Sequence, residues 1–267
     1  MTDAPLPAPR PFGALLLTVF AWSVLVLVTA LATPATGGTL GLALGLLLGF
    51  GGAGTLAARA LPPPADLRIG LVGFAPRLLP ALALLLPAVL LVSELDNQVA
   101  ERLFAGAQPA ATDAKLGPLD TLEWVLFGVL LRPVLEEFFF HGVVQQGVVA
   151  ALGPVRGVLF TAVLFALVRT SLFTSDAYHA TSFGLQAFAL GALLGYVRLA
   201  SGSILAGALL LAAIEGAGVL SHELRDALPI PGFNAPGAHT PAAWLLPAAV
   251  SVAAGLYGLA RLARTRS

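Results

Sequence analysis

Long apolar runs are the feature that most restricts what this chain can fold into. A helix that crosses a membrane needs roughly 20 mostly apolar residues, and helices satisfy their own backbone hydrogen bonds in lipid. The chain is 58% hydrophobic and 10% charged, whereas soluble domains carry about 25% charged residues. We therefore expect an all-α, polytopic membrane helix bundle with about eight transmembrane helices. The expected spans are 12–32, 38–58, 77–93, 119–140, 155–172, 181–200, 203–221 and 242–261.

These spans predict one integrated domain. Residues 1–118 supply the first membrane helices and a polar outer loop, and residues 119–221 form a core of helices. Residues 222–267 add a second outer loop, the last transmembrane helix and a basic tail. Residues 141–152 are too short to cross a membrane alone, so they continue the fourth helix or lie along the interface.

Basic residues predict the orientation of the chain. With the amino terminus in the cytoplasm, the outer side holds only Arg102, Lys115 and Arg225, and most other basic residues fall on the inner side. An excess of Lys and Arg in the cytoplasmic loops is the usual arrangement. We therefore expect both termini to be cytoplasmic and the protein to lie in the bacterial inner (plasma) membrane.

Charged residues within the apolar spans are the candidates for function. A charged side chain at bilayer depth costs about 3 kcal/mol or more, so it is kept when it is paired, solvated in a cavity or functional. The spans contain Arg132, Glu136, Glu137, Arg169 and Glu215. The net charge of zero argues against a nucleic-acid partner. The absence of cysteine excludes disulfides and thiolate sites.

Helix geometry predicts which of these residues meet. Neighbouring positions differ by about 100° in direction, so Glu136 and Glu137 face different partners. Glu137 shares a face with His141, and Arg132 shares a face with Glu136. Arg169 and Glu215 both lie roughly 18–20 Å from the predicted cytoplasmic edge, which favours an ion pair between them.

The glycine ladder Gly41, Gly45 and Gly49 predicts a close helix contact, either within the chain or in a dimer. The polar cluster has two interpretations as well. The buried charges neutralise one another as a structural network, or a carboxylate acts as a general base or a metal ligand.

The motifs of this region resemble a known family. The string PVLEEFFFHGVV around Glu136 is similar to the EExxxR motif of the CPBP family, intramembrane proteases related to type II CAAX prenyl proteases and bacteriocin-processing enzymes. LFALVR (164–169) resembles the family's FxxxH motif, and residues 191–216 resemble its third region. The resemblance covers roughly residues 119–221. It implies an eight-helix membrane fold and hydrolysis of peptide bonds inside the membrane.

The same resemblance implies a catalytic centre from which this chain departs. In the family a glutamate, two histidines and an asparagine activate a water, with a divalent metal. Glu136 and Glu137 match the paired glutamates, but His141 stands at the motif arginine and Arg169 at the second-motif histidine. The histidine and asparagine of the third motif fall on Leu211 and Glu215. An arginine offers no lone pair to a metal, and leucine offers no polar atom.

Three functions follow from these residues. The leading hypothesis is a CPBP-family membrane protein with impaired or absent proteolysis and no metal cofactor, which binds a transmembrane or lipidated peptide and contacts membrane lipid. The first alternative is an active endopeptidase that uses Glu136 and Glu137 in an altered centre, with or without a zinc-like ion. The second alternative is a small transporter whose carboxylates relay protons. The candidate site residues are Glu136, Glu137, His141, Arg169 and Glu215.

Overall fold

A computed structural model describes residues 9–104, 118–173 and 176–264 of the chain. It is 83% helical and contains no strand in this described part, which confirms the expected all-α bundle. Seven helical segments among the described residues are long and apolar enough to cross a membrane. They match the predicted spans other than 119–140. Residues 119–140 are helical as well, but the charges of the polar cluster make this segment less apolar than the others.

The amino-terminal quarter of the chain forms a helical hairpin. The first arm is α1 (Pro11–Thr36), and the second arm joins α2 (Gly38–Leu46), the π-helical η1 (Leu47–Gly52) and α3 (Ala53–Arg59). Gly37 makes the turn with a φ of 84°, a conformation that glycine adopts without strain.

The glycine ladder of the second arm faces the first arm. A Cβ on Gly45 would lie 2.7 Å from the backbone oxygen of Leu25, and a Cβ on Gly49 would lie 2.7 Å from that of Ala21. The ladder therefore serves packing within the chain, because only glycine allows the two backbones to approach so closely.

The third membrane segment is longer than the predicted span 77–93. It follows the short α4 (Ala65–Ile69) and consists of η2 (Pro76–Leu78), α5 (Leu79–Ala83) and α6 (Ala88–Leu103). The chain stays helical beyond residue 93 because its polar side chains there have hydrogen-bond partners. Glu94 accepts a hydrogen bond from the backbone N–H of Thr240 at 2.9 Å, and Asp96 accepts one from the hydroxyl of Tyr178 at 2.8 Å. Lys115 lies outside the described residues.

One continuous helix then runs from residue 118 to residue 152, so residues 141–152 continue the fourth helix. It is followed by three long helices and, after a loop, by the last one. The segments of the continuous helix are α7 (Pro118–Glu123), η3 (Trp124–Leu131), α8 (Arg132–Glu136), η4 (Glu137–Val144) and α9 (Gln145–Leu152). The later helices are α10 (Pro154–Phe173), α11 (Ala177–Ser201), α12 (Ile204–Glu223) and α13 (Ala242–Arg264).

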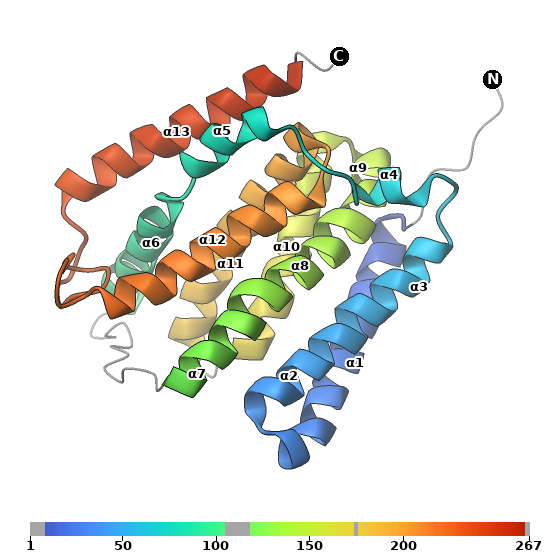
Figure 1. Cartoon of the computed structure of the whole chain (residues 1–267), viewed down its shortest axis with the longest axis horizontal. Coiled ribbons are helices and arrows are strands. Elements are labelled where there is room, and N and C mark those ends of the chain that lie inside the picture. Colours follow the sequence, from blue (N-terminus) through green and yellow to red (C-terminus); the bar gives the residue numbers. More distant parts are fainter. Residues whose placement is uncertain (1–8, 105–117, 174–175, 265–267) are drawn as a thin grey trace.

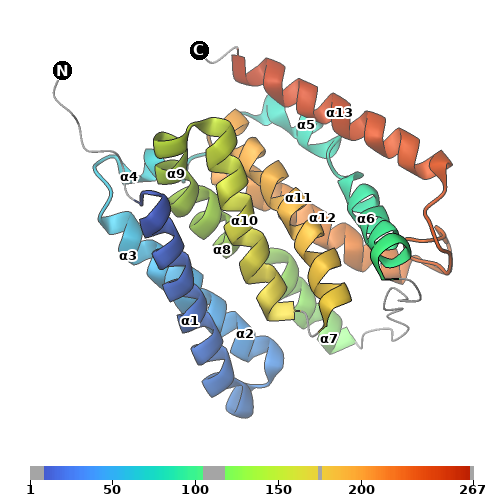
Figure 2. The ribbon, with the colours of Figure 1, turned by 180° about the vertical axis from the view of Figure 1, so that it is seen from behind.

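The hairpin and the last helix flank this central group on opposite sides. Figures 1 and 2 show α1 to α3 along one flank, α13 beside α5 along the other, and α8, α10, α11 and α12 between them. The beginning of α1 and the end of α13 lie at the same end of the bundle, together with α4 and α9. The two ends of the described chain therefore lie at the same end of the bundle.

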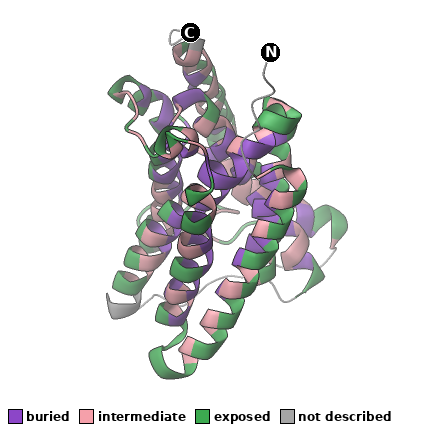
Figure 3. Ribbon diagram, turned by 90° about the vertical axis from the view of Figure 1, so that its right-hand side faces the viewer, coloured by how far each residue is buried: buried purple, intermediate pink, exposed green. Residues whose placement is uncertain are grey.

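Burial follows the pattern of a bundle surrounded by lipid. Buried residues lie on the inward faces of the helices, and the outward faces are largely exposed (Figure 3). Those outward faces carry large apolar side chains, for example Phe12 and Leu31, each 72% exposed. Such exposure is unfavourable in water and suits contact with acyl chains.

Candidate functional site

The paired glutamates lie where α8 passes into the π-helical segment η4. Glu136 is 2% exposed and Glu137 is 0% exposed. As expected from their one-residue offset, they face different neighbours. Glu136 faces Arg169 of α10, whereas the carboxylate of Glu137 lies against the backbone of Gly207 in α12. The two glutamates therefore belong to two separate clusters.

The first cluster centres on Arg169, which bridges two carboxylates. Its Nη2 donates to Oε1 of Glu215 at 2.6 Å, and its Nε lies 3.3 Å from Oε1 of Glu136. The predicted ion pair between Arg169 and Glu215 is confirmed. Equal depth on α10 and α12 brings the two side chains together, as helix geometry predicted.

Arg132 joins the first cluster through Glu215. Its Nη2 lies 2.7 Å from the same Oε1 that Arg169 contacts. The guanidinium groups also pack over aromatic rings, Arg132 over Trp124 at 5.5 Å and Arg169 over Phe165 at 5.1 Å. Glu215 is thus shared by two cations, each of which is further stabilised by an aromatic face.

The second cluster contains His141 and Glu137. Nε2 of His141 lies 3.7 Å from Oε1 of Glu137, and both side chains are fully buried. Nδ1 of His141 lies 2.7 Å from Oε1 of Gln145, whose Nε2 donates to the backbone oxygen of Gly195 at 2.9 Å. The sequence analysis missed Gln145. Its spacing of four residues from His141 is the signal that could have revealed it.

The structure therefore divides the candidate residues. Glu136, Arg169 and Glu215 come together, and Glu137 and His141 form the other group. Leu211, at the position of a family histidine, is fully buried and offers no polar atom. Within the residues that the structure describes, no group of three or more His, Cys, Asp or Glu side chains is arranged to hold a metal ion.

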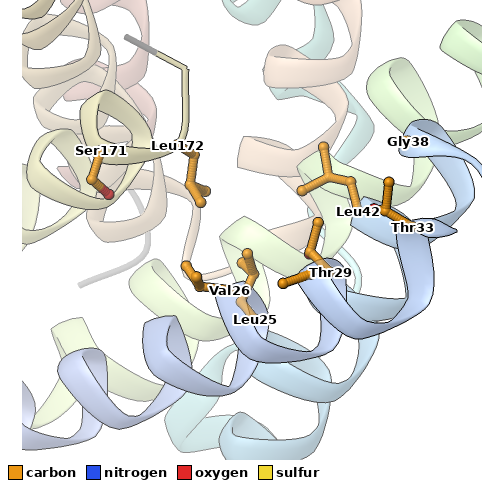
Figure 4. Close-up of a pocket in the computed structure, with 9 residues that line it drawn as sticks. Leu25, Val26, Thr29, Thr33, Gly38, Leu42, Ser171 and Leu172 are labelled. Carbon is orange, nitrogen blue, oxygen red and sulfur yellow. The ribbon is translucent and has the colours of Figure 1, made fainter. Parts of the chain in front are cut away.

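An open groove lies between the hairpin and the far end of α10 (Figure 4). Its walls are mainly aliphatic, with hydroxyl groups at intervals. The hydroxyl of Thr29 is buried and has no hydrogen-bond partner within the described ranges. The groove is lined by Leu25, Val26, Thr29, Ala30, Thr33, Gly38, Leu42, Ser171 and Leu172.

Comparison with known proteins places this site in a family. Residues 118–216 match the model of the type II CAAX prenyl endopeptidase Rce1-like family. This segment contains both polar clusters. Neither the curated proteins nor the solved structures gave a match. The match confirms the resemblance found in the motifs over this segment, and the seven candidate spans in the described part of the chain support an integral membrane protein.

Proposed function

We propose that this protein binds lipidated or transmembrane peptides in the manner of its family but does not hydrolyse them. The observation that carries the proposal is the position of Arg169, whose guanidinium lies between the carboxylates of Glu136 and Glu215. These are the positions at which the family's motifs have water-activating residues. A fixed cation between the two carboxylates neutralises them and leaves little basicity for activating a water.

The residues of the site do not suit a divalent metal. A catalytic zinc takes about three protein ligands from imidazole nitrogen or anionic oxygen. Arg169 offers no lone pair and its positive charge repels a cation. The histidine that the chain does contain, His141, contacts Glu137 and Gln145 rather than the Arg169 cluster. We therefore assign no residue of this chain as a metal ligand.

A second candidate function is supported by one atom of Glu136. Its Oε2 is buried and has no hydrogen-bond partner in the described part of the chain. In an active endopeptidase this oxygen would accept a proton from water, and Arg169 would stabilise the oxyanion that forms. The two candidates differ in one observable, which is product formation that depends on Glu136.

The groove of Figure 4 supports the binding part of the proposal. A prenyl or acyl chain is apolar and flexible, and an open aliphatic groove between helices suits it. The hydroxyl oxygens of Thr33 and Ser171 can accept hydrogen bonds from the polar end of a peptide, while the hydrogen of Ser171 is donated to the backbone oxygen of Val168. The family name specifies CAAX prenyl endopeptidases, so we propose a prenylated carboxyl-terminal peptide as the ligand.

The experiment is a binding measurement in lipid nanodiscs with a fluorescent farnesylated peptide and its unprenylated counterpart. The prenylated peptide should bind saturably and be recovered intact. Val26→Trp fills the groove and should weaken binding at least tenfold. Leu27→Trp is the matched control, because Leu27 follows Val26 in α1, is 59% exposed and does not line the groove. Equal binding of both peptides, or equal effects of the two variants, would contradict the proposal.

A further inference from the structure

The pair formed by Glu137 and His141 is the polar feature that the proposed function leaves unused. It makes none of the ion pairs of the Arg169 cluster, although the ring of His141 lies 5.9 Å from that of Phe165 in α10. The carboxylate of Glu137 is covered by Gly207 of α12, and the imidazole lies against Gly195 of α11. Both side chains are 0% exposed. Among the residues that the structure describes, neither oxygen of Glu137 nor Nε2 of His141 has a hydrogen-bond partner.

Gln145 determines which imidazole nitrogen carries hydrogen. Its amide nitrogen donates to the backbone oxygen of Gly195 at 2.9 Å, which directs its amide oxygen towards His141. An amide oxygen can only accept, so Nδ1 of His141, at 2.7 Å, must be the donor. In a neutral ring Nε2 then carries a lone pair. That lone pair faces Oε1 of Glu137 at 3.7 Å.

Two acceptors that face each other in a buried site repel and leave hydrogen-bonding capacity unsatisfied. Such an arrangement destabilises the folded protein for each unsatisfied group, and more strongly when the group is charged. One proton between the two groups removes the conflict, because it supplies the missing donor. A side-chain adjustment of about 1 Å brings the two atoms to a normal hydrogen-bond distance.

The charges of the neighbouring cluster indicate whether Glu137 is ionised. In the first cluster, the positive charges of Arg132 and Arg169 offset the negative charges of Glu136 and Glu215. An ionised Glu137 would therefore be an excess anion in a fully buried position. Arg198 acts on this pair electrostatically, but it is only partly buried and donates to the backbone oxygen of Arg68 at 3.0 Å.

We propose that Glu137 is a protonated carboxylic acid whose O–H donates to Nε2 of a neutral His141, forming a proton-binding site separate from the Arg169 cluster. A neutral pair avoids the desolvation of two ions, which is the main cost of a buried carboxylate–imidazolium pair. The site takes one proton as its ligand, and Gln145 is its positioning residue. Glu137, His141 and Gln145 together hold that proton away from water.

Infrared and nitrogen NMR spectra of the protein in lipid bilayers test the proposal directly. The infrared spectrum should contain a carboxylic acid carbonyl band that disappears in Glu137→Gln and persists in Glu136→Gln. Nitrogen-15 spectra of labelled histidine, assigned with His141→Asn, should show His141 with hydrogen on Nδ1 alone. An imidazolium spectrum for His141, or no acid band removed by Glu137→Gln, would overturn the proposal.

Stability of the two glutamine variants provides a second measurement that does not depend on spectroscopy. In Glu137→Gln the amide can donate to Nε2 in place of the acid, so the melting temperature should stay within about 2 °C of the unmodified protein. Glu136→Gln removes a charge that faces Arg169 and should lower the melting temperature by about 4 °C or more. A loss in Glu137→Gln as large as that in Glu136→Gln would show that Glu137 is ionised.

Discussion

Arg169 of α10 donates a 2.6 Å hydrogen bond to Glu215 of α12, and the two residues stand at the positions that resemble the histidine and asparagine of the family's motifs. The same guanidinium reaches Glu136 at 3.3 Å. The proposed loss of hydrolysis rests on this arrangement. The same contacts determine how substitutions of these buried charges change the stability of the protein.

Removing Arg169 should destabilise the protein strongly. Arg169→Ala leaves Glu136 and Glu215 without their shared cation in a site with little access to water, and loss of one partner of a buried ion pair costs about 3–5 kcal/mol. Adding Glu215→Ala should recover part of the loss, because the cluster then holds one cation, Arg132, and one carboxylate, Glu136. Thermal melts of the single and double variants in detergent measure this coupling. A harmless Arg169→Ala would exclude the pairing as a stabilising interaction.

Gly207 should tolerate no side chain. A Cβ at this position would fall directly on the carboxylate of Glu137, which is fully buried and would have to move. Gly207→Ala should therefore lower the free energy of unfolding by about 1–3 kcal/mol, despite alanine's higher helix propensity. Gly218→Ala, on the same helix with nothing within 4 Å of the added Cβ, is the control and should be neutral or stabilising. Equal melting temperatures for the two variants would show that Glu137 does not pack against α12.

The hairpin glycines should affect folding rather than association. Gly45→Leu forces apart α1 and α2, since even a Cβ there would lie 2.7 Å from the backbone oxygen of Leu25. Yield and melting temperature should fall. Gly38→Leu places a side chain in open space on the same helix and serves as the comparison. Sedimentation analysis in detergent distinguishes the alternatives, because a stable Gly45→Leu protein that merely changes its oligomeric state would indicate a dimer face.

Placing the residues of the family's motifs at their matching positions in this chain should create a site that binds a divalent metal. The combined variant Arg169→His, Leu211→His and Glu215→Asn returns two imidazoles and an amide to the positions that match the motifs. It should gain affinity for a divalent metal, measured by elemental analysis after gentle purification, because neutral imidazoles replace a cation. The same variant with Glu136→Gln is the control for any peptidase activity gained. No metal uptake by a folded triple variant would show that other parts of the core also exclude it.

The sequence predicted the fold well because each helix is a long apolar run, and such runs have few alternatives in lipid. It also predicted the Arg169–Glu215 pair, since depth along two helices follows from residue counting. It did not predict that Arg132 reaches Glu215 or that Gln145 orients His141. Those contacts depend on how each helix is rotated about its axis, and side-chain packing between helices sets that rotation.

The predicted span 77–93 is shorter than the third membrane segment of the structure for a related reason. Glu94 and Asp96 indicate a loop by composition. In the structure they remain helical because Thr240 and Tyr178, distant in the sequence, donate hydrogen bonds to them. Partners that come from distant parts of the chain are not visible in a local reading of polarity.

The most direct measurement of the central claim is hydrolysis of a farnesylated CAAX peptide by the protein in nanodiscs, followed by mass spectrometry beside the Glu136→Gln variant. With Arg169 held between Glu136 and Glu215, the two proteins should release the same background amount of product. Product from the unmodified protein that disappears in a folded Glu136→Gln variant would contradict the account.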